Sequence, residues 1–181
     1  MPDLSIIIVN YNTRRLLDEC LASLQTAVLP PNGLEIIVVD NASTDGSQEM
    51  VWLKYPGVQV IACEQHRGFS AANKLGAAGA NGRTLLFLNS DTVVSEEALI
   101  QPIDYLDAHE NAGAITVRLV YPTGERDPDN HRGFPTPWNS LCHFSGLGRI
   151  FPKSPLFNDY FQSYADFDQT HACHLYTSPS P

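Results

Sequence analysis

Polar residues follow four predicted strands at the points where these strands end. Asn10-Tyr11-Asn12 ends the first strand, Asp40-Asn41 the second, and Asn89-Ser90-Asp91 the fourth, while Arg67-Gly68-Phe69 follows the third. In an open parallel sheet, ligands bind beyond the carboxyl ends of the strands. Each polar group alone also fits turn chemistry, because Asn, Asp and Ser favour turns and caps. Four such groups on one sheet edge favour a binding site.

The elements that position these groups alternate between strands and helices. Short apolar runs rich in β-branched residues predict buried parallel strands, and apolar residues spaced by three and four predict helices. The predicted strands are 4–9, 34–39, 58–63, 84–88 and 114–120, and the predicted helices are 13–29, 45–54 with Asp45 as N-cap, 68–78 and 96–109. Alternation through short loops predicts an α/β fold with a mainly parallel, Rossmann-like sheet flanked by helices.

The regular spacing of apolar residues fades after Tyr121. We therefore predict a nucleotide-binding core in residues 1–121 and an irregular, incomplete region in 122–172, because long structureless stretches are rare in compact domains. Residues 173–181 are excluded from the fold prediction, because Leu175–Pro181 resembles an in-frame translation of a sequencing adaptor. His171, Cys173 and His174 at its border are read as part of this tail rather than as a metal cluster.

Four motifs occur in order in the first half of the chain: SIIIVNYN, EIIVVDNASTDGS, GFSAANKLG and LLFLNSDT. Together they resemble family-2 glycosyltransferases, which have the GT-A fold. The segment RGFPTP at 132–137 is similar to the rhamnosyltransferase-like branch of that family. The resemblance implies a donor site for a nucleotide sugar at the carboxyl edge of the sheet.

The resemblance also implies roles for individual residues. Tyr11 would offer a ring surface to the nucleotide base, and Asp40 would accept hydrogen bonds from the base or ribose. Asn73 and the backbone near Gly68 would line the pocket, where glycine allows close approach. The full set of expected donor-binding residues is Tyr11, Asn12, Asp40, Asn41, Gly68, Asn73 and Asn89.

Asn89-Ser90-Asp91 takes the place of the family's Asp-x-Asp motif. Asp91 would bind Mg²⁺ or Mn²⁺ together with the donor diphosphate and so act in catalysis, since hard oxygen ligands suit these ions. Asn89 departs from the motif and leaves a single carboxylate. The general base of the family lies after a Gly-Ala strand that the chain lacks, and Asp166 and Asp168 come too early in the pattern.

The implied activity is an inverting, metal-dependent transfer from a nucleotide sugar, such as a dTDP-rhamnose or UDP-sugar donor, to a glycan or lipid-linked acceptor. The setting would be polysaccharide synthesis for a bacterial cell envelope. The alternative is a nucleotide-binding fragment without activity, because the acceptor half and the base are missing. A Rossmann dehydrogenase would need a glycine fingerprint after the first strand, where Asn10-Tyr11-Asn12 stands instead.

The composition narrows the remaining classes of function and location. Eleven basic and twenty acidic side chains give a net charge of −9, which argues against a nucleic-acid partner. No apolar run approaches the roughly 20 residues that span a bilayer. We therefore expect a cytoplasmic protein, compatible with peripheral association at the inner face of the membrane. Cys20, Cys63, Cys142 and Cys173 are widely spaced, which favours reduced thiols, mostly buried.

Overall fold

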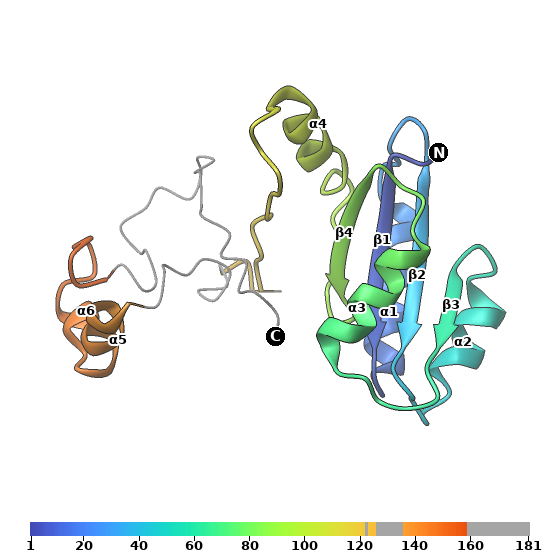
Figure 1. Ribbon diagram of the computed structural model, residues 1–181, viewed down its shortest axis with the longest axis horizontal. Coiled ribbons are helices and arrows are strands. Elements are labelled where there is room, and N and C mark those ends of the chain that lie inside the picture. The colour runs from blue at the N-terminus through green and yellow to red at the C-terminus, as the bar shows by residue number, and fades with distance from the viewer. Residues whose placement is uncertain (122, 126–135, 159–181) are drawn as a thin grey trace. The chain divides into compact units, whose positions relative to one another are not determined.

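The chain folds around a parallel four-stranded sheet with the strand order β3-β2-β1-β4 (Figure 1). In this computed structural model, residues 1–121, 123–125 and 136–158 are described. The strands are β1 (Leu4–Asn10), β2 (Leu34–Asp40), β3 (Gln59–Ala62) and β4 (Thr84–Asn89). The helices of the sheet region are α1 (Arg14–Thr26), α2 (Ser47–Lys54), α3 (Phe69–Gly79) and α4 (Ile100–Ala108). The predicted α/β class with a parallel sheet is confirmed.

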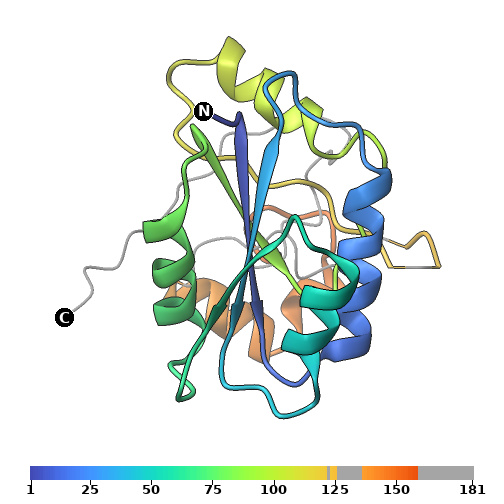
Figure 2. The same ribbon diagram turned by 90° about the vertical axis from the view of Figure 1, so that its right-hand side faces the viewer.

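Both faces of the sheet are covered by helices, as the turned view makes clear (Figure 2). Alternate residues of the central strand β1 are buried in different cores on the two faces. Ile6 and Ile8 are fully buried in the larger core, which includes residues of α1, α2 and α4. Ile7 is fully buried in the smaller core under α3. A strand buried on both faces reads as a continuous apolar run, which is why this one is recognisable in the sequence.

Helix α3 packs closely on the sheet because it is built from small residues. A Cβ atom added at Gly76 would lie 2.6 Å from Cγ2 of Ile7, so no larger residue fits there. Gly68 precedes the helix as its N-cap with φ of +79°, a conformation that favours glycine. The predicted close packing of this helix is confirmed.

Two helix starts differ from the predictions. Helix α2 has Gly46 as its N-cap, and Asp45 instead accepts hydrogen bonds from the backbone of Ser47 and of Arg14, the first residue of α1. Asp45 thus serves two helix starts from one position outside both. The predicted helix 96–109 begins later, at Ile100, after a series of turns.

The predicted fifth strand, residues 114–120, is wrong. Residues 112–119 belong to no strand, Val120 forms only an isolated bridge, and the whole stretch 114–120 is exposed. The β-branched residues of this stretch give it strand propensity, but a strand also needs a neighbour with which to form its ladder. In the described part of the chain, β4 is the last strand on its side of the sheet.

The chain divides into two units, Met1–Val117 and Arg118–Pro181. The second unit contains α5 (Pro137–Phe144) and α6 (Leu147–Ile150), so the region predicted to be irregular is partly helical. Helix α5 begins with Pro137 after Thr136, whose hydroxyl accepts a hydrogen bond from the backbone of Asn139. Proline at the first position and threonine at the cap are strong helix-start signals that the prediction overlooked.

Several sequence predictions lie outside the described residues. These are the roles of 132–135 in the branch resemblance, Asp166, Asp168, His171, Cys173, His174 and the tail 173–181. Within the described ranges, Cys20, Cys63 and Cys142 are buried free thiols, as predicted. In the same ranges, no helix is both long enough and apolar enough to cross a bilayer.

Candidate functional site

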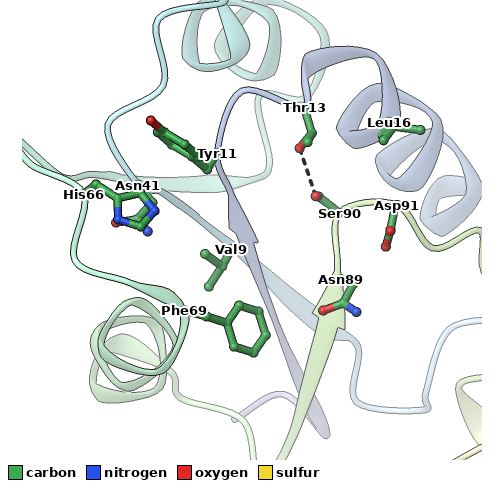
Figure 3. Close-up of a pocket in the computed structure, with 10 residues that line it drawn as sticks. All are labelled: Val9, Tyr11, Thr13, Leu16, Asn41, His66, Phe69, Asn89, Ser90 and Asp91. Carbon is green, nitrogen blue, oxygen red and sulfur yellow. Dashed lines mark hydrogen bonds between the residues drawn. The ribbon is translucent and has the colours of Figure 1, made fainter. Parts of the chain in front are cut away.

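An open cavity of about 280 Å³ lies at the carboxyl edge of the sheet (Figure 3). It is formed by the ends of β1, β2 and β4, the start of α1, and the loop between β3 and α3. The lining residues are Val9, Tyr11, Thr13, Leu16, Asn41, His66, Phe69, Asn89, Ser90 and Asp91. All of them belong to the first unit of the chain.

One end of the cavity is aromatic. Tyr11 is 49 % exposed, and its ring meets the imidazole of His66 edge-on with centroids 4.5 Å apart. Phe69 is 58 % exposed and lies below them in the close-up (Figure 3). Exposed aromatic rings around a cavity can stack on a planar ligand group. This end therefore suits a nucleotide base.

Asn41 borders the aromatic end with a fixed amide. Its Oδ1 accepts a hydrogen bond of 2.8 Å from the backbone N–H of Arg67. Because a backbone N–H needs an acceptor, this bond fixes which side of the amide carries oxygen. The Nδ2 group of Asn41, a donor, is left over from this hydrogen bond, and the residue lines the cavity. The side chain is otherwise buried, so its orientation is set by the fold.

The other end of the cavity is polar and is formed by the turn after β4. The backbone N–H of Thr92 donates to the carbonyl of Asn89, which closes the turn. The Sγ atom of Cys20 lies 3.8 Å from the same carbonyl, and burial raises the pKa of this thiol to about 12, so it stays protonated. The turn is thus held from the side of α1.

Asp91 is exposed at this polar end, and its carboxylate has no hydrogen-bond or ion-pair partner among the described residues. Asn89 is also exposed and lines the same wall (Figure 3). Carboxylate and amide oxygens without protein partners are available to a hard cation. No cluster of three or more acidic, His or Cys residues that could hold a metal occurs in the described part of the chain.

Four predicted residues do not line the cavity. Asp40 is 1 % exposed, and its carboxylate accepts three hydrogen bonds from within the protein. Asn12 has φ of +54°, and its Oδ1 accepts a hydrogen bond from the backbone of Thr44. Gly68 caps α3, and Nδ2 of Asn73 donates to the carbonyl of Phe69 in the same helix. These residues support the loops and the helix start around the cavity.

The lining includes residues that the sequence analysis did not assign. Val9, Thr13, Leu16, His66, Phe69 and Ser90 all line the cavity. Ser90 and Phe69 lay within the recognised motifs, directly after β4 and at the start of α3, so their place in these motifs was a usable signal. His66 had no such signal, because only the path of the loop after β3 brings it to Tyr11.

Comparison with known proteins decides the family. The family model of glycosyl transferase family 2 matches residues 5–169, which is most of the chain. The chain belongs to glycosyl transferase family 2. Over 136 residues it is 35 % identical to the poly(ribitol-phosphate) beta-glucosyltransferase of Bacillus spizizenii, covering 73 % of this chain and 20 % of that protein. Over 135 residues it is 30 % identical to the minor teichoic acid biosynthesis protein GgaB of Bacillus subtilis, covering 71 % and 15 %.

Solved structures support the same assignment. The structure of S. aureus TarS residues 1–349 in complex with UDP-GlcNAc matches this family-2 chain with a TM-score of 0.55 and 27 % identity. The match covers 61 % of this chain and 32 % of that one. The complex of the same TarS region with UDP matches equally well. The GT-A fold expected from the motifs is therefore confirmed.

The chain spans only about a fifth of the length of the first two curated relatives. Most of the length of each of those relatives lies outside the aligned region.

Proposed function

We propose that this chain forms the donor-binding part of a glycosyltransferase that uses a nucleotide sugar. The observation that carries the proposal is the cavity with an aromatic end at Tyr11 and an unpartnered carboxylate, Asp91, at the other. A nucleoside diphosphate has the same polarity, with a flat base at one end and a charged diphosphate at the other. Membership of family 2 favours a transferase over the alternative of a fragment that only binds nucleotide.

The base binds against Tyr11 at the aromatic end of the cavity. Tyr11 supplies a surface for stacking, and Asn41 donates a hydrogen bond to a carbonyl of the base from its fixed amide. The expected contact of Asp40 with the base or ribose stays a prediction. The three hydrogen bonds that its carboxylate already accepts favour a supporting role, in which Asp40 orients its neighbours.

Asp91 and Asn89 fit a divalent cation that is shared with the diphosphate. A single carboxylate with an amide oxygen is too small a set for an all-protein cage, but Mg²⁺ is commonly held by one or two carboxylates together with phosphate oxygens and water. Mg²⁺ or Mn²⁺ held there would neutralise charge on the departing nucleoside diphosphate. Asp91 binds the ion, and the turn that Thr92 closes onto Asn89 keeps the carboxylate at the cavity wall.

The proposed chemistry is an inverting displacement, in which an acceptor hydroxyl attacks the anomeric carbon as the nucleoside diphosphate leaves. A carboxylate base must remove the proton of that hydroxyl. No described residue at the cavity other than Asp91 is acidic, and Asp91 is assigned to the cation. We therefore propose that the base comes from sequence after the four motifs, beyond the donor site.

UDP sugars are the preferred donor class in this proposal. Support comes from the matched TarS structures, which hold UDP and UDP-GlcNAc, at 27 % identity. The dTDP-rhamnose donor rests on the branch resemblance alone and stays a prediction. The names of the relatives favour a poly(ribitol phosphate) or teichoic acid polymer as the acceptor. Action at the cytoplasmic face of the membrane stays a prediction.

Calorimetric titration of the purified chain tests the proposal. UDP should bind, and addition of Mn²⁺ should raise its affinity at least tenfold, because Asp91 would hold the cation and the cation would offset the charge of the diphosphate. Uridine without the diphosphate should bind with an affinity that Mn²⁺ does not change. Failure of UDP to bind in the presence of Mn²⁺ would contradict the proposed donor site.

A further inference from the structure

A chain of buried and part-buried hydrogen bonds begins at the carboxylate of Asp40. This carboxylate accepts hydrogen bonds from Nδ2 of Asn10 at 2.8 Å, from the backbone N–H of Ser43 at 2.9 Å and from Nε2 of Gln48 at 2.7 Å. A carboxylate surrounded by three donors acts as an acceptor only. The amide of Asn10 must therefore turn its nitrogen toward Asp40. Asn10 is fully buried, so it has no second orientation in solvent.

The fixed amide of Asn10 determines the proton of Thr13. With Nδ2 toward Asp40, Oδ1 of Asn10 points the other way and accepts a hydrogen bond of 2.7 Å from the hydroxyl of Thr13. A hydroxyl carries one proton, and that of Thr13 is used in this bond. Toward any other partner, Oγ1 of Thr13 is then an acceptor.

The next partner in the chain is Ser90. Its Oγ lies 2.9 Å from Oγ1 of Thr13, and Figure 3 shows the two side chains facing each other across the top of the cavity. Because Thr13 has no proton left to give, Ser90 is the donor in this contact. The proton of Ser90 is thus held by Thr13, and the lone pairs of its oxygen remain for the cavity that it lines.

We propose that Ser90 determines specificity for ribose by accepting a hydrogen bond from a ribose hydroxyl of the donor nucleotide, and that Thr13 and Asn10 enforce this acceptor state. The inference rests on the proposed function. In a nucleoside diphosphate, the ribose joins the base to the diphosphate. Ser90 lies between Tyr11, assigned to the base, and Asp91, assigned to the diphosphate end (Figure 3).

The polarity of the contact selects the partner. Diphosphate oxygens carry no proton at neutral pH and cannot donate to the lone pairs of Ser90. The 2′ and 3′ hydroxyls of ribose are the donors in the middle of the nucleotide. A site that accepts a hydrogen bond from a ligand hydroxyl rejects the analogue without that hydroxyl, because the acceptor is left without a partner.

Deoxy analogues of UDP test the contact by calorimetry in the presence of Mn²⁺. The unaltered chain should bind either 2′-deoxy-UDP or 3′-deoxy-UDP about fivefold more weakly than UDP, as expected for the loss of one hydrogen bond. In Ser90→Ala, the affinity for UDP should fall about fivefold, and the ratio between UDP and that analogue should approach one. Ser95→Ala, which removes an exposed hydroxyl outside the cavity, is the matched control and should keep the ratio.

Two variants of Thr13 test whether Thr13 keeps Ser90 in its acceptor state. Thr13→Val removes the hydroxyl with little change of shape and releases the proton of Ser90, so the preference for UDP over the deoxy analogue should decrease. Thr13→Ser keeps the hydroxyl and should restore the preference. Melting temperatures of both variants report whether the fold is retained.

The outcomes separate this inference from the proposed function on which it rests. If UDP binds but neither deoxy analogue is discriminated, the role of Ser90 is overturned and the donor site stands. If Ser90→Ala abolishes discrimination while Thr13→Val leaves it intact, the enforcement by Thr13 is overturned. If the unaltered chain does not bind UDP with Mn²⁺, the proposed function fails and this inference fails with it.

Discussion

The two edges of the sheet use charged and polar residues in opposite ways. At the amino edge, Asp3 accepts hydrogen bonds from the backbone and side chain of Asn32 and from Nε of Arg83. The guanidinium of Arg83 continues to Asp107 on α4, with a second contact of 2.7 Å. Glu35 likewise accepts from Ser5 and Asn81. These partners bind the strands, loops and α4 together.

The carboxyl edge divides its polar residues between two tasks. Asn10 and Asp40 are buried and satisfied by internal hydrogen bonds, like the residues of the amino edge. Asn89 and Asp91 are exposed at the cavity, and no described residue binds the Asp91 carboxylate. A carboxylate at a sheet edge is therefore a candidate ligand only when the fold has not already supplied its donors.

Replacing the two carboxylates of the carboxyl edge should have very different effects on stability. Asp40→Ala leaves the buried donor of Asn10 and the half-buried donors of Ser43 and Gln48 without their acceptor, and it should cost about 3 kcal/mol of unfolding free energy. Asp91→Ala removes an exposed group and should change it by less than about 0.5 kcal/mol. Urea unfolding without ligand measures both. Equal losses in the two variants would remove the distinction between the buried and the open carboxylate.

The amino edge should be sensitive to volume. A Cβ atom added at Gly82 would lie 2.5 Å from the backbone nitrogen of Ser5, so the backbone must shift. Gly82→Ala should therefore cost about 2 kcal/mol, as overpacking does. Gly57→Ala is the control, since its Cβ would meet no atom within 4 Å. Similar urea midpoints for the two variants would show that the contact at Gly82 is relieved at no cost.

The amino edge should also contribute to acid sensitivity. Hydrogen bonds from the backbone and side chain of Asn32, together with Arg83, lower the pKa of Asp3 from 3.8 to about 2. A lowered pKa in the folded state means that this stabilisation is present above pH 3.8 and is lost as the pH falls toward 2.

The melting temperature of Asp3→Asn, compared with that of the unaltered chain across this range, measures the effect. The variant should be less stable above pH 3.8, and the difference should shrink toward pH 2. Asp104→Asn, at an exposed position of α4, should follow the unaltered chain throughout. A difference between Asp3→Asn and the unaltered chain that does not change with pH would contradict the role of the Asp3 charge.

Much of the sheet could be predicted because its strands are buried on both faces. The apolar runs of β1 and β2 are short and rich in β-branched residues, which favours buried strands. The run 114–120 has the same residue types, yet it forms no strand in the described chain. Residue type sets the propensity of such a run, whereas strand formation depends on a neighbour that the local sequence does not supply.

The sequence predicts which edge of the sheet carries the site. It does not predict which polar residues of that edge are buried and which line the cavity. Asp40 and Asn41 are adjacent, and both are polar at the end of one strand. The fold directs Asp40 to Asn10 and Gln48 and brings Asn41 to the cavity. Hydrogen-bond partners 30 residues away along the chain decide this, as between Asn10 and Asp40, and local patterns do not reveal them.

The most direct test of the account compares one carboxylate from each edge. The affinity for UDP is measured by calorimetry with and without Mn²⁺ for the unaltered chain, Asp91→Ala and Asp107→Ala. We predict that Asp91→Ala abolishes the gain in affinity that Mn²⁺ provides, whereas Asp107→Ala, which loses only a partner of Arg83, retains it. An undiminished Mn²⁺-dependent gain in Asp91→Ala would contradict the central claim that the open carboxylate at the carboxyl edge binds the cation.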